Sequence, residues 1–294
     1  MIQLIKNQNI DKKRWDSVIS SSKISYYYAF SWYLDAVSPN WCALVSTNYE
    51  QIMPLHIKYK FGFLPHLAHP PFAQQLGVFG DGAYSVDDFF EKIPRKFLKI
   101  DAQLHHGEKP KYIDFIERTN YIIYLDVPYN DLLMRYHKDK MRYSIRKSKE
   151  LNTQIDVCED YHQIIDLYLT DIMADKLKVN HQYYNNLYKV LDVIKANHQK
   201  IEGYVIRENG IIIAALIATH YQDQIAFLAT YNNYLGRKRY GLYRLWDYFI
   251  EKYANSKKYI NVQGTDHPTV GLFYKRFGAV EQKYYHHKKN IFNF

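Results

Sequence analysis

The stretch Tyr259–Ala279 has the pattern of a ligand-binding turn. It opens with aromatic and β-branched residues typical of a short strand, which stops at Gly264. Asp266 or the threonine before it can then cap a short helix, with Pro268 in its first turn and Gly278 at its end. A polar turn that follows the carboxyl end of a strand is where open α/β sheets place ligands.

A second stretch with chemical potential is Gly236–Arg244, which opens a predicted helix. Arg237, Lys238 and Arg239 are consecutive cations, and cations before a helix N-terminus attract phosphate groups. The alternative is a solvated basic turn without a ligand. Both interpretations stay open from the sequence.

Other common reactive constellations are missing from the sequence. Cys42 and Cys158 lie far apart and form no CxxC pair, so neither a zinc knuckle nor a disulfide framework is predicted. The histidines near positions 66–69, 105–106 and 286–287 are not backed by carboxylates at ligand spacing, and we expect them on surfaces or in loops rather than on a metal. No Ser-His-Asp arrangement or P-loop occurs.

Length and charge suggest two domains with different partners. The chain has 294 residues, of which 47% are hydrophobic and 23% charged, as in soluble globular proteins of two domains. The net charge is +9, but residues 1–127 hold 14 Lys and Arg against 13 Asp and Glu. The excess therefore lies in the second part, which indicates either an anionic partner or a solvated basic face.

Targeting signals and membrane spans are not apparent. No charged-then-apolar leader opens the sequence, and no apolar run approaches the roughly 18 residues that a span needs. We therefore expect a cytoplasmic protein.

The expected secondary structure repeats. Both halves are interpreted as β-α-α-β-β-β-α-β-α-β, and the second half has a hairpin over Asn209-Gly210, a strong turn signal. In the first half, Leu64–Gly82 is interpreted as a long loop, and a short helix is expected near Lys111–Arg118. Residues 128–152 have helical periodicity with seven Lys and Arg against three acids, which predicts one basic connecting helix.

The order of elements and the segment Tyr274–Ala279 resemble the GNAT acyltransferase fold. The family signature is Tyr-x-x-x-Gly-Phe preceded by Asn-x-x-Ala, and this chain keeps Tyr274 and Gly278. The remaining signature positions hold His267, Val270 and Ala279. Two such units, with Gln263-Gly264-Thr265 followed by Phe-Gly-Ala, look like the FemABX-type double-GNAT proteins of bacteria.

The resemblance implies an α/β (α+β) fold with two tandem GNAT-like domains. Each would be a mixed, mostly antiparallel sheet flanked by helices. The expected divisions are an N-terminal domain at 1–127, a basic connecting helix at 128–152, and a C-terminal domain at 153–294 that carries the active site.

Acyl transfer to an amine needs a proton acceptor, donors for the carbonyl oxyanion and an acid for the departing thiolate. The resemblance gives the acid role to Tyr274, with core packing as the alternative. Backbone N–H groups where the strand Ile225–Thr230 diverges from its neighbour would bind the oxyanion. Asp266 is the candidate base, although helix capping explains it equally well. Tyr231 and His267 are expected near the substrate.

The cofactor expected from the resemblance is acyl-CoA, such as acetyl-CoA, and no metal. GNAT enzymes hold its pyrophosphate with Arg/Gln-x-x-Gly-x-Gly/Ala, which here is Lys238-x-x-Gly241 with Tyr243 at the last small position. The expected donor-binding residues are Arg237, Lys238, Arg239, Tyr240 and Gly241.

Three functions remain open. The first is an N-acyltransferase that acts on a small-molecule or peptide amine bound between the two domains. The second, also implied by the FemABX resemblance, is aminoacyl transfer from charged tRNA onto a cell-wall precursor. The third is a non-catalytic GNAT-like binding or scaffold module, suggested by Tyr243 and Val270 at positions where the family has small residues.

Overall fold

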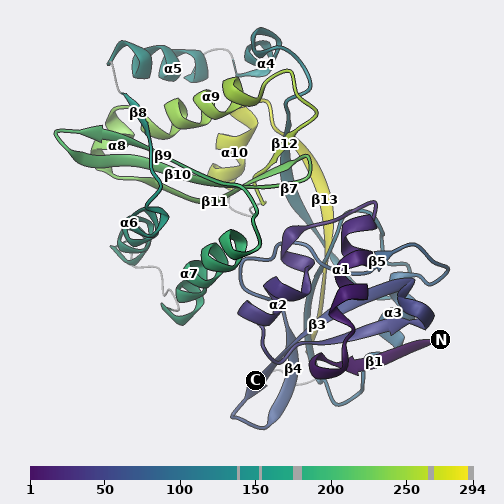
Figure 1. Ribbon diagram of the computed structural model, residues 1–294. Helices are drawn as coiled ribbons and strands as arrows, with labels where there is room; N and C mark the ends of the chain where they lie inside the picture. Colours follow the sequence, from purple (N-terminus) through teal and green to yellow (C-terminus); the bar gives the residue numbers. More distant parts are fainter. Residues whose placement is uncertain (138–139, 152–153, 175–180, 264–267, 291–294) are drawn as a thin grey trace. The chain divides into compact units, whose positions relative to one another are not determined.

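The computed structural model describes residues 1–137, 140–151, 154–174, 181–263 and 268–290. The chain divides into two compact units. Unit 1 comprises residues 1–119 and 283–294, and unit 2 comprises residues 120–282. The chain crosses from one unit to the other within β7 (Ile116–Tyr124) and returns within β13 (Val280–Asn290) (Figure 1). Unit 1 is therefore built from both ends of the sequence.

Unit 1 is a mixed sheet with helices. Besides parts of β7 and β13, its elements are β1 (Ile2–Lys6), α1 (Lys12–Ser21), α2 (Ser31–Val37), β2 (Cys42–Ser46), β3 (Gln51–Lys60), β4 (Leu64–Ala68), β5 (Phe79–Gly80), α3 (Val86–Glu91) and β6 (Lys99–Leu104). The strand order is β1-β2-β3-β4-β6-β13, with β5 on β3. The pairs are antiparallel except that of β4 with β6.

Local sequence explains where the helices of unit 1 begin. The Asp11 carboxylate accepts a hydrogen bond of 3.0 Å from the Arg14 amide at the start of α1. Ser85 and Asp88 form a reciprocal capping box at the start of α3. The apolar sides of the strands then pack against α3 through Val86 and Phe89, which are buried.

The strands of unit 2 are also arranged in mixed directions. In chain order its remaining elements are α4 (Tyr129–Arg135), α5 (Lys140–Glu150), β8 (Ile155–Val157), α6 (Tyr161–Ala174), α7 (His181–Ala196), β9 (Ile201–Glu208), β10 (Ile211–Tyr221), β11 (Gln224–Asn232), α8 (Tyr234–Lys238), α9 (Gly241–Tyr253), β12 (Tyr259–Asn261) and α10 (Pro268–Arg276). The strand order is β7-β12-β11-β10-β9-β8. Only β11 and β12 are parallel among the pairs whose register is described. The mixed, mostly antiparallel architecture predicted from the sequence is confirmed.

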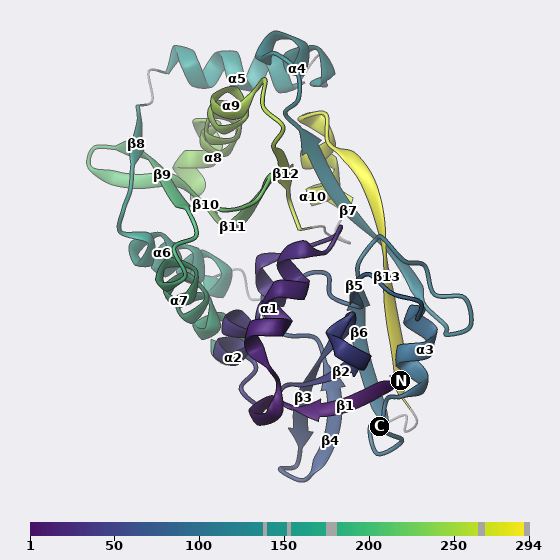
Figure 2. The same ribbon diagram turned by 45° about the vertical axis from the view of Figure 1, so that its right-hand side comes forward.

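Helices cover both faces of this sheet. In Figures 1 and 2, α9 lies on one face of β9–β11 and α6 lies on the other. The face of α9 that meets the strands carries Leu245, Trp246, Phe249 and Ile250, all buried. The predicted hairpin turn is confirmed, because Asn209 and Gly210 both have positive φ, 50° and 80°.

Three local predictions are wrong. Leu64–Gly82 is not one loop, because its first residues form β4. The helix expected near Lys111–Arg118 is not formed: three amides there, those of Lys111, Tyr112 and Ile113, donate to the Asp87 carboxylate, and β7 begins at Ile116. The described part of residues 128–152 contains two helices, α4 and α5, both of which belong to unit 2.

Two features are absent from the residues that the structure describes. No helix in these ranges is both long and apolar enough to cross a bilayer. The same ranges contain no group of three or more His, Cys, Asp or Glu placed to hold a metal ion.

Candidate functional site

The two parallel strands of unit 2 diverge. β11 pairs with β12 only from Gln224 to Ala226, opposite Tyr259–Asn261, yet β11 continues to Asn232. The register of β11 against β10 also shifts at this point: Phe227 pairs with Ala218, and Ala229 pairs with Ile217. Leu228 is therefore the extra residue of a β-bulge, a device that redirects a strand beside a site. The predicted divergence of the strand at Ile225–Thr230 is confirmed.

A cavity of about 590 Å³ opens where the strands separate, within the size range of small-molecule sites. Its walls come from β11, α8, α9, α10 and α6, all of unit 2. The lining residues are Tyr168, Phe227, Leu228, Ala229, Thr230, Arg237, Leu242, Trp246, Val262, Thr269, Val270, Phe273 and Tyr274. Most are apolar, and the few polar groups are a guanidinium and hydroxyls.

Tyr274 stands in the wall of this cavity. Its ring stacks on Trp246, with centroids 5.4 Å apart and planes 15° apart, and lies 5.7 Å from the ring of Tyr121. Burial, assisted by the neighbouring Tyr121, raises the pKa of Tyr274 to about 12, so the phenol is protonated at neutral pH. Among the described residues its hydroxyl has no hydrogen-bond partner. A protonated donor is thus available at the cavity.

Glycine 271 lets α10 approach β7 closely. A Cβ added at Gly271 would lie 2.6 Å from the Tyr121 hydroxyl oxygen, so a larger residue would displace the tyrosine. Tyr121 in turn supports the Tyr274 ring. The position of Tyr274 therefore depends on a small residue one turn earlier in α10.

The start of α9 lies beside the cavity and has features of an anion site. Its N-cap, Tyr240, adopts a left-handed conformation with φ of 57° and makes no side-chain capping bond. Gly241, the first helical residue, is buried, and an added Cβ would lie 2.6 Å from the Ala214 Cβ. The first amides of an α-helix have no intrahelical acceptor, and the helix dipole makes this end positive.

The three cations before α9 have different environments. Arg237 lines the cavity and donates to the Asn232 carbonyl at 2.8 Å. The exposed Lys238 ammonium lies 4.5 Å from the Tyr234 ring centroid. Arg239 forms a two-pronged ion pair with Glu208, at 2.6 and 3.2 Å. Arg237 and Lys238 are therefore better placed than Arg239 to meet a ligand phosphate.

Searches against family models and against curated proteins find no match. Solved structures do match. The crystal structure of FemX matches this chain with a TM-score of 0.65 and 12% identity, and 96% of each chain is covered. A tandem GNAT protein from the clavulanic acid biosynthesis pathway matches with a TM-score of 0.51, 8% identity and 98% of each chain covered. The chain has a tandem GNAT fold of the FemX kind.

L-PGS from Bacillus licheniformis shares this tandem GNAT fold, with a TM-score of 0.53, 12% identity and coverage of 96% of this chain and 92% of that one. Identities this low establish the architecture alone. The diverging strands and the cavity described above thus belong to the second GNAT unit of the chain.

Other residues that the sequence predicted for the site of this tandem GNAT fold are not among the described residues that line the cavity. Tyr231 lies on β11 after Thr230 and is half-buried, outside the cavity lining. Asp266 and His267 lie outside the described residues. Tyr243 packs against Phe273, with ring centroids 5.2 Å apart, and its hydroxyl accepts a bond of 3.1 Å from Arg276.

The sequence did not single out several lining residues, notably Trp246, Tyr168 and Phe227. Trp246 belongs to the apolar face of α9 and is 2% exposed, like an ordinary core residue. Its indole N–H has no partner among the described residues. The remaining lining residues are recognisable only once β11 and β12 are seen to diverge.

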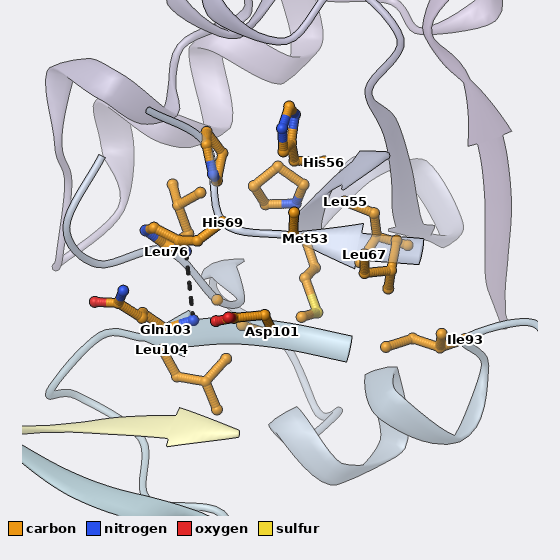
Figure 3. A pocket seen from close by; sticks show the side chains of 15 residues that line it. Met53, Leu55, His56, Leu67, His69, Leu76, Ile93, Asp101, Gln103 and Leu104 are labelled. Atoms are coloured by element: carbon orange, nitrogen blue, oxygen red, sulfur yellow. Dashed lines mark hydrogen bonds between the residues drawn. The ribbon is translucent and has the colours of Figure 1, made fainter. Parts of the chain in front are cut away.

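One cavity of unit 1 is lined partly by histidines, but it is small. Figure 3 shows His56, His69, Asp101 and Gln103 around it, with the Gln103 amide donating to His69 Nδ1 at 3.4 Å. Its volume, about 20 Å³, accommodates one water molecule. Burial lowers the pKa of His69 to about 4 and that of His56 to about 3. This cavity is too small for a substrate.

The histidine doublets were expected on surfaces or in loops. His105 and His106 do lie in the loop after β6, with His105 buried and His106 half-buried, whereas His286 and His287 are buried on β13. His105 contacts the Val78 carbonyl at 2.6 Å, and His286 pairs with Asp101 at 2.7 Å. His287 lies 2.6 Å from the Asp114 carbonyl. These three side chains therefore have partners within the fold.

Proposed function

We propose that the protein is a GNAT-type N-acyltransferase that moves an acyl group from acyl-CoA to an amine in the unit 2 cavity. The observation that carries the proposal is the divergence of β11 from β12 beside a protonated Tyr274. Unpaired strand amides can bind a carbonyl oxygen, the phenol can meet the sulfur, and the open start of α9 can meet phosphates. All three features line or border one cavity of unit 2.

The proposed reaction forms one bond and breaks one. The amine nitrogen attacks the thioester carbon, a C–N bond forms, the C–S bond breaks, and sulfur departs as a thiolate. A phenol with a pKa of about 12 cannot readily give its proton to a thiolate whose conjugate acid has a pKa near 8.5, because the transfer costs about 5 kcal/mol. Tyr274 therefore stabilises the thiolate by donating a hydrogen bond.

The amine proton needs another acceptor. Among the described residues that line the cavity there is no carboxylate and no imidazole. The acceptor amine can enter already deprotonated, with its final proton lost to solvent or to Asp266 after attack. This arrangement predicts a rate that rises with pH until the amine is neutral.

Donor binding rests on Arg237, Lys238 and the first amides of α9. Their positive charges would meet the phosphates of the donor, while the apolar cavity receives its acyl end. Gly241 fits this arrangement because its missing Cβ lets the start of α9 pack closely on β10.

Calorimetric titration with acetyl-CoA tests the donor. We expect micromolar binding by the wild type and at least tenfold weaker binding by Lys238→Glu. Lys195→Glu makes the same charge change on the exposed side of α7 and is expected to bind normally. Failure of the wild type to bind acetyl-CoA, or equal weakening by both variants, would reject this donor site.

Aminoacyl transfer from charged tRNA is the second candidate. It is supported by the FemX-like fold and by the basic helix α5. Part of that charge is neutralised: Lys149 pairs with Asp247 at 3.3 Å, and Lys147 pairs with Glu150 at 2.7 Å. If tRNA is the donor, its affinity should fall by about one log unit per log unit of salt for each phosphate contacted. Salt-independent association would argue against it.

A further inference from the structure

The tip of the β3–β4 hairpin in unit 1 exposes aromatic side chains. Lys60 pairs with Leu64 across the turn Phe61-Gly62-Phe63. Phe61 is 74% exposed and Phe63 is 70% exposed, and Tyr59 beside them is 52% exposed. In Figures 1 and 2 this hairpin is at the lower edge of unit 1. Clustered exposed apolar groups of this kind mark interaction surfaces.

Folding alone does not account for these aromatic residues. Phe61 has φ of 54° and Gly62 has φ of 81°, and a bulky residue in the left-handed region is an uncommon and strained choice. Asn or Gly would make the same turn more easily. Because most of the Phe61 side chain is exposed, its burial in unit 1 does not offset this strain. The outlier therefore points to a use outside the fold.

A hollow beside the tip combines apolar walls with positive charge. Its volume is about 520 Å³. The lining residues are Lys60, Phe61, Leu64, Pro65, His66, Lys96, Leu98, Lys99 and Asn290. Among the described lining residues, three are lysines and none is acidic. The apolar part fits an acyl chain, and the lysines fit phosphate groups.

Strand register extends the positive charge around the hollow. Asn290 of β13 pairs with Lys99 of β6, and Lys289 pairs with Ile100. Lys288 and Lys289 are exposed, so the end of β13 adds cations next to Lys99. Exposed aromatic groups ringed by lysines are the composition of surfaces that enter the headgroup region of anionic bilayers.

We propose that this end of unit 1 docks on an anionic phospholipid bilayer. Phe61 and Phe63 enter the boundary between headgroups and acyl chains, while Lys96 and Lys99 contact lipid phosphates. A bilayer matches the hollow better than a nucleic acid does, because most of the exposed surface that lines the hollow is apolar. The surface is separate from the unit 2 cavity and does not depend on the function proposed for it.

Vesicle co-sedimentation of the full chain tests the proposal. We compare vesicles of phosphatidylcholine with vesicles that contain about 30% phosphatidylglycerol, at low and high salt. The wild type should bind the anionic vesicles at least tenfold more tightly. Phe61→Ser/Phe63→Ser should weaken that binding at least tenfold, and Lys96→Gln/Lys99→Gln should remove most of the preference for phosphatidylglycerol.

The matched control is Leu4→Ser/Tyr112→Ser, which removes two exposed apolar side chains elsewhere on unit 1 and should bind vesicles normally. Thermal unfolding of every variant shows whether it is folded, and the tip variant should unfold at the wild-type temperature. Absent binding to anionic vesicles, or equal binding by the tip variant, would overturn the proposal. So would a tip variant that loses affinity for tRNA while binding vesicles as before.

Discussion

Replacing Tyr274 with Phe removes one hydroxyl group and keeps the ring. The stacking on Trp246 and the contact with Tyr121 should persist, since both are made by the ring. The hydroxyl has no protein partner among the described residues, so its loss should change the free energy of unfolding by less than about 0.5 kcal/mol. Any loss of activity would then report on catalysis.

The size of that loss follows from the proposed hydrogen bond. A hydrogen bond to a charged group contributes about 1.5–3 kcal/mol, which corresponds to roughly 10- to 150-fold in rate. The sulfur carries charge only as the C–S bond breaks, so kcat should fall while the KM for acyl-CoA stays nearly constant. Because the pKa of Tyr274 is about 12, its ionisation should not reduce the rate below pH 10.

The assay measures free thiol released from acetyl-CoA with the best acceptor from a panel of amino sugars, amino acids and polyamines. Tyr248→Phe, also on a half-buried tyrosine of unit 2 but outside the cavity lining, is the control and should keep full activity. A Tyr274→Phe enzyme with kcat within twofold of the wild type would refute the hydrogen-bond role. A fall in wild-type rate near pH 10 that disappears in Tyr274→Phe would refute the raised pKa.

Three further predictions concern stability, each measured by denaturant or thermal unfolding. Gly271→Ala should destabilise unit 2 by about 1–3 kcal/mol, because the new Cβ meets the Tyr121 hydroxyl. Adding Tyr121→Phe to this variant should recover part of the lost stability. An unchanged free energy of unfolding in Gly271→Ala would contradict the tight packing. Asp247→Ala should lower the free energy of unfolding by about 2–4 kcal/mol, since the fully buried carboxylate accepts a hydrogen bond of 2.6 Å from Tyr129 and pairs with Lys149. Asp247→Asn should lower it by less. Burial alone would raise the pKa of Glu202, but hydrogen bonds from His220, Lys252 and Tyr253 lower it well below its usual 4.5. The ionised Glu202 therefore stabilises the folded state fully above pH 4.5, and this contribution is lost as the pH falls further. Glu202→Gln should flatten this acid-side decline, and an unchanged slope would contradict it.

Sequence patterns predicted the parts of the fold that depend on local chemistry. The Asn209-Gly210 turn needs two residues of positive φ in succession, and that requirement is visible in the residue types. β4 was missed because Leu64–Ala68 contains a proline and a histidine and has little strand propensity of its own. It forms because a long neighbouring strand supplies the pairing. The prediction of a helix near Lys111 was wrong for a similar reason. The backbone amides there bind the Asp87 carboxylate, which is more than twenty residues away in the sequence.

The site was predictable where short local motifs indicate its residues. Tyr274 and Arg237 were found from short motifs, and both line the cavity. The residues that shape the cavity, such as Phe227 and Trp246, have ordinary core character in the sequence. Their role arises from the point at which two strands separate, which is a tertiary feature. Arg239 could not be distinguished from its neighbours without the position of Glu208.

The two-ended construction of unit 1 has a consequence for synthesis. Residues 1–119 leave the ribosome before unit 2, but β13, which pairs with β6 from Tyr285 to Asn290, leaves after it. Until then one edge of β6 has no partner, a state open to mispairing and aggregation. Unit 2 is a continuous segment and can fold during this interval. The first unit to be made is thus the last to be completed, and a chain that stopped before Lys283 would leave it unfinished.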